Sequence, residues 1–296
     1  MTGLINYQIF LKIFFYPCRI LCTIHLLKTR YFIYISFKGT SYHGWQVQPN
    51  SVTIQKILDN ALSTVFNEEI SATGAGRTDT GVHALVFCAH FDSNCQDLAE
   101  NKNHIFRLNR FLPKDISVTG IYKVTTEAHA RFSAVSRTYK YYISRIKDPF
   151  LEDSSWFIHG NIDMNIMNRA CMILMKYSDF TSFSRLHTDV KTNLCTIYSA
   201  IWEETDTSLV FTIKADRFLR NMVRAIVGTM TDAGTGKISL EEFENIILAK
   251  DRCRAGQSAP ARGLFLTDIE YPPDIFIRAQ DHSRSPMTGQ PGNEAF

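Results

Sequence analysis

The sequence has no pair of cysteines at Cys-x-x-Cys spacing, and its seven cysteines are odd in number. This pattern argues against a disulfide framework and against a paired-thiolate zinc site. Cys18, Cys22 and His25 come close to the spacing of metal ligands, but they lie in an apolar stretch that offers no fourth ligand. We therefore expect no metal site and a protein that works in the reducing cytoplasm.

Long uninterrupted apolar runs are also missing. Residues 4–26 are rich in Ile, Leu and Phe, but Lys12, Pro17 and Arg19 interrupt them. A helix that spans a bilayer needs roughly 18 or more consecutive apolar residues, so no membrane anchor is expected. Residues 1–30 are interpreted as an N-terminal extension, which is either an organellar leader or the product of a mis-assigned start codon.

A strong excess of one charge sign is missing as well, since the formal net charge is only +3. Such a small value does not by itself indicate a polyanionic partner. Apolar sequence, by contrast, is abundant: 45% of the 296 residues are hydrophobic. A chain of this size and composition can bury the core of one large domain or of two fused subdomains.

The apolar pattern becomes regular from residue 31 onward. Runs of β-branched and aromatic residues predict strands, and apolar residues at helical spacing predict helices. Strands are expected over residues 31–37, 85–91, 116–124, 139–143, 194–203 and 209–215. Helices are expected over residues 54–65, 104–112, 164–175, 217–231 and 240–247.

Several of these helices carry signals at their ends. Asp216 is a candidate N-cap for the helix over residues 217–231, and Gly234 is a natural stop after it. Ser239 and Glu242 have the spacing of a capping box. These signals support the boundaries that the apolar pattern predicts.

The mixture of elements predicts an α+β fold, with helices packed on a mixed, mainly antiparallel sheet. We expect two related halves, over residues 31–146 and 147–272. After Pro272 the pattern fades into a polar tail over residues 273–296. The first half would then carry the most unusual loop of the sequence.

That loop is the segment GAGRTDTGVHA at residues 74–84, which places Arg77, Thr78 and Asp79 between glycines. Glycines permit tight turns, and a carboxylate held beside an arginine can stay ionised and act as a nucleophile or a general base. Alternatively, Thr78 and Asp79 close a turn through hydrogen bonds to the backbone. A phosphate-binding loop is disfavoured, because the Gly-Lys-Ser/Thr ending is missing.

Arginines form a second pattern. Arg217, Arg220 and Arg224 would lie on one face of the helix expected over residues 217–231. They suit either phosphate contacts and pairing with a carboxylate or an ordinary solvated face.

A third segment, residues 129–141, mixes basic and aromatic side chains. RNA sites use this mixture to contact phosphates and stack on bases, although it is equally ordinary packing in a strand. Its members are His129, Arg131, Phe132, Arg137, Tyr139, Lys140 and Tyr141.

Taken together, eight segments resemble the tRNA pseudouridine synthase A family, in the same order and over about residues 31 to 272. They are SYHGWQ (41–46), GAGRTDTGVHA (74–84), LNRFLPKDI (108–116), HARFSA (129–134), RTYKYYI (137–143), DFTSF (179–183), FLRNMVRAIVG (218–228) and APARGLFL (259–266). The resemblance implies the pseudouridine synthase fold.

The resemblance also implies an activity and roles for particular residues. Asp79 would attack a target uridine, whose base then detaches, rotates and rejoins the sugar through carbon. Arg77 would hold the extruded nucleotide, Tyr139 would pack on the base and take part in proton transfer, and Arg224 would pair with Asp79. Further RNA or base contacts are expected from Thr78, Arg220 and Leu264, the last as an apolar wall under the uracil.

For partners, the resemblance implies a homodimer that acts on the anticodon arm of tRNA, at roughly positions 38 to 40, without a cofactor or metal. The departures from the family pattern are few. They are Thr80 where alanine is common, Ala128 where a bulky apolar residue is usual, and extra residues at both ends. The alternative is a protein of the same fold that binds or folds tRNA without catalysis.

Overall fold

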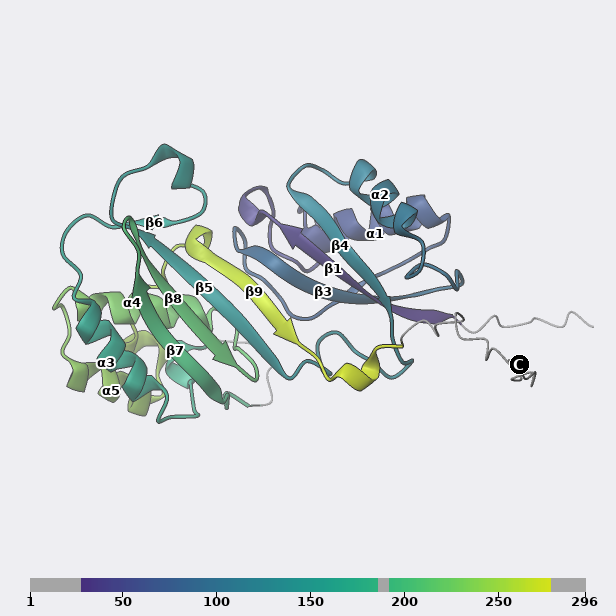
Figure 1. Cartoon of the computed structure of the whole chain (residues 1–296). Helices are drawn as coiled ribbons and strands as arrows, with labels where there is room; N and C mark the ends of the chain where they lie inside the picture. The colour runs from purple at the N-terminus through teal and green to yellow at the C-terminus, as the bar shows by residue number, and fades with distance from the viewer. Residues whose placement is uncertain (1–27, 186–191, 278–296) are drawn as a thin grey trace, which may run out of the picture.

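The computed structural model describes residues 28–185 and 192–277 (Figure 1). Cys18, Cys22 and His25, most of the expected N-terminal extension and most of the expected polar tail lie outside the described residues. Within the described residues, no helix is both long enough and apolar enough to cross a membrane.

The described strands form one mixed sheet in the order β4-β1-β3-β9-β5-β8-β7, with the short strands β2 and β6 pairing with β3 and β5. Most neighbours are antiparallel, whereas β3 with β9 and β5 with β6 are parallel. Their bounds are β1 Thr29–Phe37, β2 Thr73–Gly74, β3 His83–Ser93, β4 Ile116–Lys123, β5 Ser136–Ser144, β6 Trp156–Phe157, β7 Ile197–Glu204, β8 Ser208–Ala215 and β9 Leu264–Glu270.

Five α-helices within the described residues accompany this sheet, and α3, α4 and α5 gather beside β7 and β8 (Figure 1). They are α1 Ile54–Phe66, α2 Lys102–Phe111, α3 Met164–Leu174, α4 Met222–Gly234 and α5 Leu240–Ala249. Thr53 caps α1, and Ser239 with Glu242 forms the predicted capping box of α5. The α+β fold predicted from the sequence is confirmed.

The described residues form two hydrophobic cores. One packs β1, β3 and β4 with α1 and α2, and the other packs β5, β7 and β8 with α3, α4 and α5. Strand β9, drawn in yellow between β3 and β5 in Figure 1, contributes Leu264 to the second core but Leu266 and Ile269 to the first. This one strand therefore joins the two halves of the sheet.

The start of α4 corrects a prediction. The helix begins at Met222, after Asn221 in a left-handed conformation with φ of 66°, and not at Arg217. Asp216 is not its N-cap, because its Oδ1 accepts hydrogen bonds from the backbone N–H groups of Thr196 and Arg217 and thereby closes a turn. Residues 216–221 are consequently a loop, and the prediction that three arginines share one helix face was wrong.

Candidate active site

The loop that carries Asp79 lies near the point where strand β3 exchanges one neighbouring strand for another. Strand β3 pairs with β9 only at His83 and Ala84, and further along β3 pairs with β2 instead. The loop runs from the end of β2 to the start of β3, so it lies at the junction between the two halves. Side chains from both halves can therefore reach Asp79.

Residues 39–46 hold this loop from one side. Gly44 has a φ of +80°, and a Cβ atom added there would lie 2.2 Å from the carbonyl oxygen of Thr78. The backbone N–H of Gly81 donates to the carbonyl of Tyr42 over 3.4 Å, and that of Val82 donates to the carbonyl of Asp79 over 3.2 Å. The backbone around Asp79 is thus fixed by a close approach that only glycine permits.

We expect Gly44→Ala to lower the free energy of unfolding by about 1–3 kcal/mol, since it combines a strained positive φ with a clash against backbone. Gly76→Ala is the matched control in the same loop system, because a Cβ there meets nothing within 4 Å. Urea unfolding of both variants measures the difference. Equal stability of the two would contradict the assigned close contact.

The carboxylate of Asp79 faces two guanidinium groups. Arg224 Nη1 donates to Oδ2 over 3.1 Å, and Arg220 Nε lies 3.6 Å from Oδ1. The side chains of Asp79 and Arg224 are each 20% exposed, whereas that of Arg220 is 44% exposed. No side-chain-to-backbone hydrogen bond of Asp79 or Thr78 occurs in the described part of the chain, so the turn-closing alternative finds no support there.

Arg224 is itself held in place by the segment before β9. Its Nε donates to the carbonyl of Ala259 over 2.7 Å, and the backbone N–H of Ala259 donates to the carbonyl of Arg224 over 2.9 Å. A Cβ added at Gly228 on the same helix would lie 1.8 Å from the carbonyl oxygen of Gln257, so helix and segment touch directly. This contact fixes the direction in which the guanidinium meets Asp79.

Tyr139 on β5 is half-buried, and its ring meets that of Phe218 edge-on at a centroid distance of 5.0 Å. Burial raises the pKa of Tyr139 to about 12, and the nearby charge of Asp79 raises it further while that of Arg137 lowers it. The phenol is therefore neutral at pH 7. Strands β5 and β9 pair so that Leu266 lies opposite Tyr139 and Leu264 lies opposite Tyr141. The side chain of Leu264 is largely buried.

Further arginines gather at the edge of this site. Burial lowers the pKa of Arg131, and the charges of Arg77, Arg217 and Arg137 lower it further. Arg137 donates to the carbonyls of Ala75, Arg131 and Asp216, and so ties three loops together. The loop at residues 216–221, although not a helix, brings Arg217 and Arg220 to the same region.

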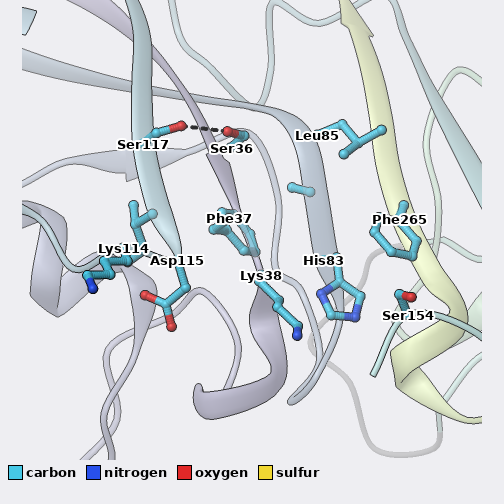
Figure 2. Close-up of a pocket in the computed structure, with 12 residues that line it drawn as sticks. Ser36, Phe37, Lys38, His83, Leu85, Lys114, Asp115, Ser117, Ser154 and Phe265 are labelled. Atoms are coloured by element: carbon cyan, nitrogen blue, oxygen red, sulfur yellow. Dashed lines mark hydrogen bonds between the residues drawn. The ribbon is translucent and has the colours of Figure 1, made fainter. Parts of the chain in front are cut away.

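His83 begins β3, four residues after Asp79, and lines a hollow together with Lys38, Ser154 and Phe265 (Figure 2). Its Nδ1 accepts from the backbone N–H of Gly39 over 3.0 Å, and its ring stacks on Phe265 at 4.5 Å. Burial lowers its pKa, so the ring is neutral near pH 7. Asp79 does not line this hollow, and His83 has the contacts of a residue that braces the loop.

A family model described as tRNA pseudouridine synthase matches residues 33–133 and 177–272, which is more than half of the chain and includes Asp79, Arg220 and Arg224. The chain belongs to the tRNA pseudouridine synthase family. The resemblance seen in the eight sequence segments is thereby confirmed.

Curated relatives agree with this membership over nearly their whole length. A tRNA pseudouridine synthase A of Bacteroides fragilis is 53% identical over 248 residues, which is 83% of this chain and 98% of the relative. The protein of the same description from Porphyromonas gingivalis is 49% identical, over 84% of this chain and 99% of its own. A protein of the same description from a Thermoanaerobacter species is 39% identical, over 81% of this chain and 98% of its own.

Sequence reasoning missed one feature of this site, the tie made by Arg137. The residue was noted for its possible contact with RNA phosphates, yet both of its terminal nitrogens donate to backbone carbonyls. Nothing in the spacing of basic and aromatic residues distinguishes an arginine that holds loops together from one that faces a ligand. Only the positions of Ala75, Arg131 and Asp216 in space reveal it.

Proposed function

We propose that the protein isomerises uridine to pseudouridine in the anticodon arm of tRNA, at roughly positions 38 to 40. The observation that carries the proposal is the carboxylate of Asp79 held 3.1 Å from Arg224 on a braced loop at the junction of the two halves. Membership of the family and the names of the relatives support the isomerisation of uridine in tRNA, whereas the anticodon arm as its target rests on the resemblance noted in the sequence.

The proposed reaction needs no external reagent, because product and substrate are isomers. The bond between C1′ of the ribose and N1 of the uracil breaks, and a bond between C1′ and C5 forms. A proton leaves C5, and one is taken up at N1. Asp79 attacks C1′ of the ribose as the bond to N1 breaks, and the bond between Asp79 and C1′ breaks in turn when C5 attacks C1′. Arg224 balances the charge of the free carboxylate when water is excluded.

The remaining roles are proposed from the family resemblance. Tyr139 relays the proton from C5: because its phenol is neutral, it passes its own hydroxyl proton to water as it takes up the C5 proton, and water supplies the proton at N1. The exposed Arg77 holds the nucleotide that has left its stack, an extrusion that costs a few kcal/mol. Thr78, whose buried Oγ1 has no hydrogen-bond partner among the described residues, and Leu264 contact the extruded nucleotide and its uracil.

The test is pseudouridine formation by the purified protein on unmodified tRNA transcripts, some with uridine and some with cytidine at the anticodon-arm positions. Product that appears only in that arm, and only when uridine is present there, supports the proposal. Product elsewhere in the tRNA would assign a different target. Tight binding of tRNA without any product would favour the alternative of a protein that binds or folds tRNA.

Arg220 is proposed to contact RNA phosphate, since it is the more exposed of the two arginines at Asp79. We expect Arg220→Ala to weaken tRNA binding and to reduce the slope of log Kd against log salt by about 1, the value for one lost phosphate contact. Binding titrations at several salt concentrations measure the slope. An unchanged slope would return Arg220 to a purely local role at Asp79.

We also propose that the protein acts as a homodimer in the cytoplasm. The family resemblance supports the homodimer. The described cysteines Cys88, Cys171 and Cys195 are buried and unpaired, which supports a reducing compartment such as the cytoplasm. Light scattering of the purified chain measures its mass. A monomer at the concentrations used for activity would overturn the dimer.

A further inference from the structure

An exposed aromatic ring stands beside the arginines of the candidate site. The ring of Phe132, in the segment HARFSA at residues 129–134, is 75% exposed. One side of it meets the ring of His129 at 4.5 Å, and the guanidinium of Arg131 lies over it at 5.4 Å from the centroid. The side chain is thus part of a small stack that still leaves most of the ring open.

The backbone under this ring is firmly held. His129 Nδ1 accepts from the backbone N–H groups of Arg131 and Phe132, over 3.1 and 3.4 Å. The N–H of His129 donates to Ser133 Oγ over 3.0 Å, and that of Ser133 returns to the carbonyl of His129 over 2.9 Å. The backbone that carries the exposed ring is therefore ordered before a partner binds, which lowers the entropic cost of stacking on the ring.

The segment is also anchored to the sheet beneath. The backbone N–H of Ala130 donates to His90 Nδ1 over 3.1 Å, and the hydroxyl of Tyr271 donates to the carbonyl of Ala130 over 2.6 Å. Burial lowers the pKa of His90 to about 4, so its ring stays a neutral acceptor near pH 7. His90 on β3 and Tyr271, the residue directly after β9, thereby hold the segment against the sheet.

One guanidinium connects this segment to the loop of Asp79. Arg137 donates through Nη2 both to the carbonyl of Arg131 over 2.6 Å and to that of Ala75 over 3.1 Å. The charges of Arg77 and Arg217 act on Arg131 as well, so positive charge surrounds the ring on the side of the site. A nucleotide whose phosphate is drawn to these arginines brings its base within reach of Phe132.

We propose that Phe132 is a stacking platform for an unpaired nucleotide that flanks the target uridine in the RNA. Every base has a π-face, so stacking on Phe132 requires an unpaired neighbour and reads no particular base. The consequence is that the flanking nucleotide must be unpaired, or must become unpaired, when the RNA is bound. This inference rests on the proposed function, which supplies the target uridine.

The test is a double-mutant cycle between protein and RNA. Wild type and Phe132→Ala are compared on an anticodon-arm tRNA transcript and on transcripts with an abasic site directly 5′ or directly 3′ of the target uridine. We expect Phe132→Ala to lower kcat/KM on the intact transcript by roughly 5- to 150-fold, mainly through KM. On the transcript that lacks the stacking base, the two proteins should differ by less than about twofold. Phe132→Trp should retain activity on the intact transcript.

Phe106→Ala is the matched control. This ring on α2 is 58% exposed and lies under the guanidinium of Arg110 at 5.9 Å, but α2 packs on α1 and β4. The activity of Phe106→Ala on every transcript should equal that of wild type. The stacking role of Phe132 is overturned if Phe132→Ala behaves like this control. It is also overturned if Phe132→Ala lowers kcat/KM by the same factor on the intact and the abasic transcripts.

Two further readouts separate the possible failures. Dissociation constants for the same transcripts measure the coupling between Phe132 and the flanking base without any need for catalysis. If wild type forms no pseudouridine, the proposed function fails, and the binding data still test whether Phe132 stacks on RNA. Light scattering shows whether Phe132→Ala lowers the mass of the particle in solution. A lower mass would place Phe132 in a contact between copies of the chain and would overturn its assignment to RNA.

Discussion

Asp79→Asn is expected to abolish pseudouridine formation, with a loss of at least about 1,000-fold in kcat, while tRNA binding stays within about tenfold of wild type. The amide has nearly the same volume as the carboxylate and can still lie beside Arg224, but it cannot attack the nucleotide. Single-turnover assays on unmodified tRNA, together with filter binding, measure the two quantities separately.

Asp206→Asn is the matched control, because this exposed aspartate lies in the turn between β7 and β8 and should leave both quantities unchanged. If Asp79→Asn lost binding and activity by the same factor, its carboxylate would serve the grip on RNA and not the chemistry. Residual activity near that of wild type would remove Asp79 from the reaction altogether.

Arg224→Ala has the second largest expected effect, a loss of about 100-fold or more in kcat with a smaller change in KM. Among the described residues, the substitution leaves Asp79 with Arg220 at 3.6 Å as its one cationic partner, and it removes the side-chain donor to the carbonyl of Ala259. Removing one partner of a partly buried pair also destabilises the fold, here by about 1–3 kcal/mol. Steady-state kinetics and urea unfolding measure the two effects.

Arg224→Lys distinguishes charge from geometry. A lysine keeps the positive charge but lacks the planar fork that donates to Asp79 and to Ala259 together, so we expect intermediate activity. Arg145→Ala removes another pair of arginine and carboxylate, in which Arg145 directly after β5 meets Glu204 at the end of β7, and it should not change kcat. Equal losses in Arg224→Ala and Arg145→Ala would point to a general loss of stability.

Most elements of the fold could be predicted from the sequence, because their burial follows simple periods. Strand β9 is the main exception. Its buried residues Leu264, Leu266 and Ile269 are spaced by two and then by three, since a bulge opposite Thr138 and Tyr139 interrupts the alternation. A search for strict alternation therefore misses the strand that joins the two halves.

The candidate site could be predicted only in part. The glycines around Asp79 mark a turn, but the pairing with Arg224 joins residues 145 apart in sequence, and no local pattern encodes it. The family resemblance supplied that pair. Asp216 shows the opposite case, because it is a good N-cap residue by type, yet the turn it forms with Thr196 is a tertiary contact and moves the start of α4 to Met222.

The place of β9 has a consequence for the growing polypeptide on the ribosome. Among the described strands β9 is the last to be synthesised, yet it lies in the middle of the sheet, between β3 and β5. A nascent chain that ends before residue 264 lacks the strand that joins the two outer sets of strands, and the segment at Ala259 that aims Arg224 has only just been synthesised. Catalytic competence is thus withheld until translation of the described region is almost complete.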